Sequence, residues 1–143
     1  MSYVMSREER EAFLAEIHVA IIGIPQQGRG PLTVPVWYTY QPNGEFHIWT
    51  GGSSRKARLI REANRFSLCV QQETPPYKYV SVEGSVISIE PIHLERELRP
   101  LVYRYYSPEK GERFLESLGG KSAGTGDVLI RMKPERWLSM VDS

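Results

Sequence analysis

The clearest pattern in the sequence is the alternation of apolar and polar positions from Leu32 to Tyr40. Successive side chains of a β-strand point to opposite faces of the sheet, so this alternation predicts a strand. It resumes from Glu45 to Thr50 after Pro42-Asn43-Gly44, and Asn-Gly is a strong hairpin signal. We therefore expect a hairpin. One face carries Leu32, Val34, Val36, Tyr38 and Tyr40, and the other carries Thr33, Pro35, Trp37 and Thr39.

Patterning and turn residues predict the remaining elements. Ser6, followed by Glu8 and Glu9, is typical of a helix start, and the apolar run from Val19 to Ile24 suits a buried strand. Gly84 is expected to mark a β-bulge or a close backbone approach. We expect helices over Ser54–Asn64, His93–Tyr106 and Pro108–Leu118 (stopped by Gly119-Gly120), a flexible loop at Gly124 and Gly126, and strands over Phe66–Gln72, Tyr79–Ile89, Asp127–Lys133 and Arg136–Val141, with Pro134 between the last two.

This order of elements predicts a mainly β domain with flanking α-helices. Most of the joins between strands are too short for parallel crossovers, so the sheet should be mainly antiparallel. A small barrel with helices packed outside it fits the element order and leaves few open strand edges. The length of 143 residues is enough for one domain with a real core, so residues 1–143 are interpreted as a single domain.

Composition narrows the function classes. Lys and Arg total 18 and Asp and Glu total 17, and this near-balance argues against a dedicated nucleic-acid-binding protein. No apolar run approaches the roughly 18 residues of a transmembrane helix, and the first residues lack the order of a signal peptide. Cys69 is the single cysteine, which fits a reducing compartment. We expect a cytoplasmic protein without a membrane partner.

The segment Thr50-Gly51-Gly52-Ser53-Ser54-Arg55-Lys56 carries the most chemical information. Glycines allow backbone N–H groups to approach a ligand, and serine hydroxyls can cap a helix or donate to phosphate oxygens. A helix N-terminus favours anions, whereas Arg55 and Lys56 at that position oppose the helix dipole. An anionic partner would offset this cost. The segment therefore predicts a phosphate-binding site, although it has no Walker-loop spacing.

The residues from Arg55 to Arg65 include five basic side chains and one acid, Glu62. Arg58, Arg61 and Arg65 either bind an anionic ligand or form a solvated helix face that pairs with nearby acids. His18, His47 and His93 lack metal-ligand spacing, so we expect no metal site and interpret them as surface or core residues. Cys69 alternates with apolar neighbours in a strand and is interpreted as inert.

Several aromatic residues are candidates for lining an apolar substrate space or, alternatively, for filling the barrel core. These are Trp37, Tyr38, Tyr77 and Tyr79. A second group lies in an expected helix and should pack against the barrel or a partner subunit. That group consists of Tyr103, Tyr105 and Tyr106.

From Ala12 to Glu90 the sequence resembles the pyridoxamine 5′-phosphate oxidase-like family of flavin-binding split barrels. Val34-Pro35-Val36-Trp37-Tyr38, a turn, Trp49-Thr50 and Ser54-Arg55-Lys56 carry the resemblance. It implies a split β-barrel: a six- to seven-stranded, mostly antiparallel Greek-key barrel with flanking helices. It also implies an oxidoreductase that transfers hydride to or from a small organic substrate. The implied cofactor is FMN or, alternatively, the deazaflavin coenzyme F-420.

The resemblance also implies roles for individual residues. Arg55 and Lys56 would bind the cofactor phosphate, assisted by Ser54 and Thr50, and the backbone from Val34 to Trp37 would line the isoalloxazine ring. Family members are homodimers with the cofactor at the interface, so the partner would supply residues from the Tyr79 strand and near Trp137. The complete expected cofactor-binding set is Val34, Pro35, Val36, Trp37, Trp49, Thr50, Ser54, Arg55, Lys56, Tyr79 and Trp137.

Departures from the family pattern argue against pyridoxamine phosphate oxidation. True oxidases of this kind carry a glutamine where Tyr79 falls and an arginine- and histidine-containing segment after the tryptophan that resembles Trp137. The deazaflavin branch would use Arg58, Arg61 and Arg65 for its acidic tail, and Gly51-Gly52 also looks more like that branch. A non-enzymatic flavin or deazaflavin carrier, or a stress-related protein of the same fold, is the alternative function. Single-stranded nucleic-acid binding is disfavoured by the overall charge.

Overall fold

The computed structural model describes residues 1–41, 44–118 and 126–142. The turn expected at Pro42-Asn43, the helix stop at Gly119-Gly120 and the loop residue Gly124 lie outside these residues. In chain order the elements are β1 (Ser2–Tyr3), α1 (Arg7–Ala15), β2 (Ala20–Ile24), β3 (Leu32–Val36), β4 (Tyr38–Tyr40), β5 (Phe46–Gly51), α2 (Arg55–Ala63), β6 (Arg65–Gln72), β7 (Tyr77–Pro91), a π-helical segment (Leu94–Leu98), α3 (Arg99–Tyr105), α4 (Pro108–Ser117) and β8 (Asp127–Asp142).

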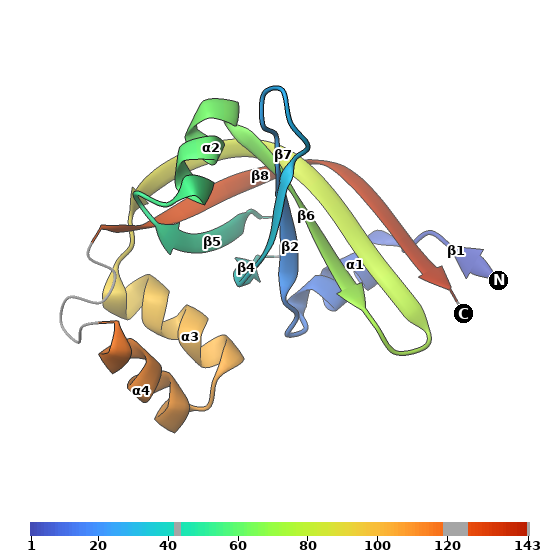
Figure 1. The fold of residues 1–143 in the computed structure, drawn as a ribbon. Helices are drawn as coiled ribbons and strands as arrows, with labels where there is room; N and C mark the ends of the chain where they lie inside the picture. The colour runs from blue at the N-terminus through green and yellow to red at the C-terminus, as the bar shows by residue number, and fades with distance from the viewer. Residues whose placement is uncertain (42–43, 119–125, 143) are drawn as a thin grey trace.

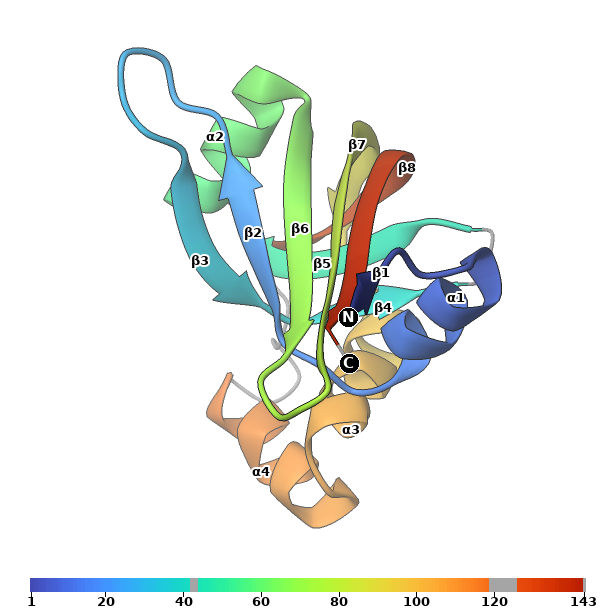
Figure 2. The same cartoon turned by 90° about the vertical axis from the view of Figure 1, so that its right-hand side faces the viewer.

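The strands form one antiparallel sheet that curves into a barrel without closing by hydrogen bonds (Figures 1 and 2). Its order is β3-β2-β6-β7-β8-β5-β4, and β1 pairs with the end of β8. The two end strands, β3 and β4, are consecutive in sequence and are joined through Trp37. The chain itself therefore connects the two edges of the sheet, and the predicted split barrel with flanking helices is confirmed.

The predicted strand from Leu32 to Tyr40 is interrupted at Trp37. Its facing pattern is nevertheless correct, since Val36, Tyr38 and Tyr40 are buried while Thr33 and Pro35 are exposed. β3 pairs with β2 and β4 pairs with β5, so the two halves join different neighbours. The chain must turn at Trp37 to serve both pairings, and an alternating pattern does not reveal such a turn.

The two strands expected on either side of Pro134 are one continuous strand, β8. Glu83 pairs with Arg136 and Gly84 pairs with Pro134, which leaves Glu135 as the extra residue of a bulge. A proline cannot donate to the ladder, and the bulge accommodates it. A Cβ atom added at Gly84 would lie 1.9 Å from the carbonyl oxygen of Lys133, so the predicted bulge and the predicted close approach are both present.

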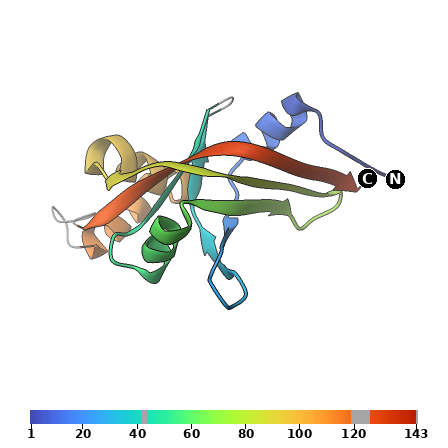
Figure 3. The same cartoon turned by 90° about the horizontal axis from the view of Figure 1, so that it is seen from above.

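β7 and β8 run along the length of the molecule, from the helices to the chain termini (Figure 3). The barrel interior is filled by apolar residues of every long strand, including Ile22, Ile48, Phe66 and Ile130, which are all buried. α1 begins at the expected cap, because the Ser6 hydroxyl accepts a hydrogen bond from the Glu9 N–H at 3.1 Å. None of the described helices is long and apolar enough to cross a membrane.

The helix expected over His93–Tyr106 begins with the π-helical segment Leu94–Leu98 and continues as α3. α3 and α4 pack against each other beside β5, on the opposite side of that strand from α2 (Figure 1). A second apolar cluster joins this helix pair to the barrel and includes Leu98, Val102, Leu115 and Leu129. The helices therefore cover one flank of the barrel, and this flank carries the candidate site.

Candidate functional site

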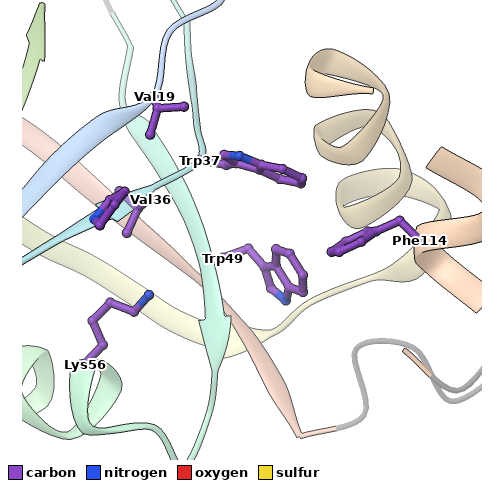
Figure 4. Close-up of a pocket in the computed structure, with 7 residues that line it drawn as sticks. Val19, Val36, Trp37, Trp49, Lys56 and Phe114 are labelled. Atoms are coloured by element: carbon purple, nitrogen blue, oxygen red, sulfur yellow. The ribbon is translucent and has the colours of Figure 1, made fainter. Parts of the chain in front are cut away.

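A cavity of about 290 Å³ lies between the barrel, the start of α2 and α4 (Figure 4). Apolar side chains form most of its wall, and Lys56 projects into it from the first turn of α2 (Figure 4). The full lining is Val19, Pro35, Val36, Trp37, Trp49, Lys56 and Phe114. Five residues of the cofactor-binding set expected from the sequence are thus brought together: Pro35, Val36, Trp37, Trp49 and Lys56.

Lys56 is the one charged residue among the described residues that line this cavity. Its side chain is half-buried, and within the described part of the chain no carboxylate lies within ion-pair distance of it. Burial lowers the pKa of its ammonium group below the ordinary lysine value, because leaving water disfavours the charged form. A half-buried cation facing an apolar cavity would be stabilised by an anion placed beside it.

The start of α2 presents two hydroxyls near Lys56. Ser54 is the N-cap, and its Oγ accepts a hydrogen bond from the Ala57 N–H at 3.1 Å. The hydroxyl of Thr50, which is buried at the end of β5, lies 3.2 Å from the Ser54 Oγ. Helix N-termini favour anions because their first N–H groups have no partner within the helix. The Thr50 and Ser54 hydroxyls thus lie together at the start of the helix whose first turn carries Lys56, and chemistry of this kind suits an anion.

The glycine pair before α2 has a structural role. The Gly52 N–H donates to the carbonyl oxygen of Gly126 at 2.7 Å, so this N–H is already bonded and does not serve a ligand as the sequence suggested. A Cβ atom at Gly52 would lie 2.2 Å from that same oxygen. Arg61 donates to the Gly52 carbonyl at 2.7 Å. These contacts fix the path of the chain from β5 into α2.

The basic residues of α2 have different surroundings. The exposed Arg55 donates to the Gln26 side chain at 2.6 Å and lies outside the cavity lining. Arg65 begins β6 rather than extending the helix, and it donates to Glu83 at 3.0 Å and to Glu135 at 3.1 Å, so the expected pairing with acids holds for it but the expected helix face does not. Arg58 is exposed and has no polar partner among the described residues.

An aromatic wall lies opposite Lys56 (Figure 4). The ring centroids of Trp37 and Trp49 are 6.4 Å apart, and Phe114 lies 5.7 Å from Trp37 and 6.1 Å from Trp49. The Trp49 indole N–H donates to Asp127 at 2.9 Å, which fixes that ring. Aromatic side chains with restricted rings are suited to contact a flat apolar group.

Two lining residues, Val19 and Phe114, were not among the expected site residues. Phe114 lies on α4, far along the chain from the cavity strands, and it reaches the site through the packing of α4 beside the barrel. Its sequence signal was only that of an apolar residue on an amphipathic helix. Val19 precedes β2, and the sequence assigned it to a buried strand, whereas it is exposed and outside that strand.

The remaining expected residues lie away from the cavity in this chain. Val34 packs against the barrel core. Trp137 also packs there, beside Tyr40 and Phe46, and the Arg10 guanidinium lies 3.9 Å from its ring centroid. Tyr79 pairs with Gln71 and Met140 on the strands β6 and β8, at the end of the sheet near the chain termini.

The other candidate aromatics are divided between core and surface. Tyr38 is fully buried and donates to the Leu14 carbonyl at 2.9 Å, so the barrel-core interpretation is correct for it. Tyr77 is exposed and does not line the cavity. Tyr105 and Tyr106 pack against Trp37, as expected for the helix that carries them.

The histidines and the cysteine have surroundings that suit structural roles. His18 and His47 each contact a glutamate, Glu16 at 3.0 Å and Glu45 at 2.7 Å, while the His93 side chain caps the π-helical segment. Burial raises the pKa of the Cys69 thiol, which disfavours the reactive thiolate form. Within the described residues, no group of three or more His, Cys, Asp or Glu side chains could hold a metal ion.

No protein-family model and no curated protein matches this sequence. Solved structures match its fold. An F420 reductase has a TM-score of 0.74 at 18% identity, covering 90% of this chain and 94% of its own. A conserved hypothetical protein from Mycobacterium tuberculosis has a TM-score of 0.75 at 22% identity, with coverage of 97% and 86%. A FAD-binding protein from Mesorhizobium loti has a TM-score of 0.63 at 17% identity, with coverage of 100% and 98%. The fold expected from the resemblance is therefore confirmed.

Proposed function

We propose that the protein binds a flavin-type cofactor and that the start of α2 holds the cofactor phosphate. The observation that carries this proposal is Lys56, a half-buried cation without an ion-pair partner in the described chain that projects into an apolar cavity. The Ser54 and Thr50 hydroxyls lie at the same helix start and can donate to phosphate oxygens. Arg55 contributes a second cation at the rim once it exchanges Gln26 for the anion.

The residues present fit such a group. Its flat ring would lie against Pro35, Val36 and Trp37, with Trp49 and Phe114 closing the apolar wall. The cavity of about 290 Å³ is at the lower end of ligand sites, which typically measure roughly 300–1,000 Å³. A site of this size in one chain is consistent with a cofactor that a second copy of the protein also covers.

The reaction we propose is hydride transfer to or from a small organic substrate, and a bound flavin or deazaflavin supplies that redox chemistry. The chain contributes binding through Lys56, orientation through the tryptophan rings and exclusion of water through Phe114. A substrate phosphate is disfavoured, since Lys56 is the charged residue of the described lining and is committed to the cofactor. We therefore do not assign pyridoxamine phosphate oxidation.

FMN is the favoured cofactor over the deazaflavin. Of the arginines available for an acidic deazaflavin tail, Arg65 is paired with Glu83 and Glu135, and Arg61 is bonded to the Gly52 carbonyl. Arg58 alone of these three makes no polar contact within the described residues. One exposed arginine is weak support for a ligand tail with several negative charges.

We further propose a homodimer with the cofactor at its interface. In Figure 2 no helix of the described chain lies in front of the outer face of β3, β2, β6 and β7. A cross-strand row on this face begins with Ile21, which is 39% exposed, and ends with Leu138, which is 59% exposed. Tyr79 lies on β7, one of these strands. An uncovered face of this kind is a typical protein interface.

A second candidate function is a non-catalytic carrier of the same cofactor. The cavity lining contains Lys56 but no histidine or carboxylate among the described residues, so it offers no acid–base pair for a substrate. A carrier predicts cofactor binding without hydride transfer to any acceptor. An oxidoreductase of this kind would depend on the cofactor itself for the proton balance.

Titration of the purified protein with FMN and, separately, with coenzyme F-420 tests the proposal. We expect saturable binding of FMN that weakens by about tenfold to a hundredfold in Lys56→Ala, because hydrogen bonds to charged groups contribute roughly 1.5–3 kcal/mol. Arg113→Ala is the matched control, since it removes an exposed cation of α4 that pairs with Glu109. Absence of binding of either cofactor refutes the proposal, and binding without turnover of an acceptor panel favours the carrier.

A further inference from the structure

A side chain forms hydrogen bonds with the backbone at the free edge of β4. Tyr38 is the first residue of this end strand of the sheet. Its N–H donates to the Tyr105 hydroxyl at 3.1 Å, and its carbonyl oxygen lies 3.1 Å from the same hydroxyl. A phenol from α3 thus occupies the position that a neighbouring strand would otherwise fill.

The Tyr105 hydroxyl also forms a hydrogen bond on the other side of the gap between the two edges of the sheet. It donates to the His18 carbonyl at 2.7 Å, in the segment just before β2. A hydroxyl has one proton and two lone pairs, so it can accept from Tyr38 and donate to His18 at once. Tyr105 therefore links the edge strand β4 to the chain that enters β2, across the gap that the sheet leaves open.

Both anchor points lie next to residues that line the cavity. Val19 follows His18, and Trp37 precedes Tyr38. The Tyr105 ring also stacks on Trp37, with centroids 4.7 Å apart and planes 7° from parallel. The hydroxyl fixes the spacing between the Val19 and Trp37 backbones, and the ring fixes the orientation of the Trp37 indole.

We infer that Tyr105 is a positioning residue that sets the shape of the cofactor cavity without contacting the cofactor phosphate. The contacts of α3 with the rest of the protein hold Tyr105 in place for this role. Arg104, the preceding residue, donates to the Glu16 carbonyl at 2.7 Å beyond the end of α1, and Leu101 and Val102 are buried. The inference that the cavity is a cofactor site rests on the proposed function, whereas the geometry of the wall does not.

The first test needs no cofactor. We expect Tyr105→Phe to accelerate hydrogen exchange of the Tyr38 amide and to shift the amide resonances of Val19 and Trp37, measured by NMR on the free protein. Tyr103→Phe is the matched control, because Tyr103 lies on the same helix and its hydroxyl contacts Glu112 on α4 instead. Unchanged protection of the Tyr38 amide in Tyr105→Phe would overturn the inference.

The second test measures FMN binding by the same variants. We expect Tyr105→Phe to weaken FMN binding about threefold to tenfold and Tyr103→Phe to leave it unchanged. The near-ultraviolet circular dichroism of the stacked tryptophan should persist in Tyr105→Phe and be lost in Tyr105→Leu. A lower melting temperature with wild-type FMN affinity would show a purely structural role and refute positioning. If the wild-type protein binds neither FMN nor coenzyme F-420, the proposed function fails, while the exchange test still decides how the cavity wall is built.

Discussion

At the scale of single residues, Lys56 is where burial and charge conflict most clearly. Its pKa is lowered by burial in the free protein, and a phosphate beside it would raise that pKa again. Protonation and anion binding are therefore linked. The contribution of Lys56 to anion affinity is fully present below the pKa that Lys56 has in the free protein. It is lost as the pH rises toward the higher pKa that Lys56 has in the complex.

This linkage gives a prediction for pH dependence. FMN affinity should fall as the pH rises through the alkaline range, beginning below the pH at which an ordinary lysine, with a pKa of about 10.4, loses its proton. The fall should be absent in Lys56→Arg, because the guanidinium stays charged over that range. Dissociation constants measured across this range would check the expectation. Identical pH profiles of the wild-type protein and Lys56→Arg would show that Lys56 does not bind the cofactor.

A second residue-scale prediction concerns Gly84. Its Cβ position lies 1.9 Å from the Lys133 carbonyl oxygen, and the backbone of β8 cannot move without breaking the ladder. We expect Gly84→Ala to destabilise the protein by about 1–3 kcal/mol or more in chemical denaturation. Gly30→Ala is the control, because no atom lies within 4 Å of its Cβ position. Equal stability of both variants would contradict the close approach.

Local sequence signals indicated Lys56 and Trp37, and the family resemblance added Trp49, but neither could supply Phe114. A cation at a helix start is visible in the sequence because it opposes the dipole of its own helix. Phe114 belongs to the site through the packing of α4 beside β5, and no local pattern encodes that contact. Arg65 looked equivalent to its neighbours, and only the fold brings Glu83 and Glu135 to it.

At the scale of elements, the N-cap of α2 should contribute both to stability and to binding. Ser54→Ala removes the hydroxyl that caps Ala57, and we expect a loss of about 1 kcal/mol of stability. Ser107→Ala at α4 is a matched control, since its Oγ accepts from the Lys110 N–H at 3.3 Å outside the cavity lining. FMN affinity should fall in the first variant alone. Equal FMN affinity in the Ser54→Ala and Ser107→Ala variants would show that the N-cap of α2 does not bind the phosphate.

Periodicity and turn residues predicted the longer helices and strands but not the two-residue β1. They also did not predict the break at Trp37 or the continuity of β8 through Pro134. Trp37 keeps the alternation of its neighbours, so the break between β3 and β4 is invisible until the pairing of each half is known. Pro134 looked like a strand end because it lacks an N–H group. It lies opposite Gly84 at a bulge, where the ladder is already interrupted, and β8 continues.

At the scale of the whole molecule, the uncovered sheet face predicts the assembly. Leu138→Glu places a charge in the exposed cross-strand row and should convert a dimer to a monomer in sedimentation experiments. Ile87→Glu is the control, because Ile87 is also exposed but lies in the β7 bulge outside that row. FMN affinity should fall together with dimerisation if the site is shared. A wild-type monomer at micromolar concentration would refute the shared site.

The position of β8 has a consequence for synthesis of the chain. β8 follows every other described strand in the sequence, yet it pairs with β7 on one side and β5 on the other. Until residue 142 has left the ribosome, β3-β2-β6-β7 and β4-β5 have no strand to join them. Domains commonly fold as units during translation, and pairings between distant segments form slowly. The nascent chain should therefore remain as two separate strand groups, sensitive to proteases, until β8 emerges.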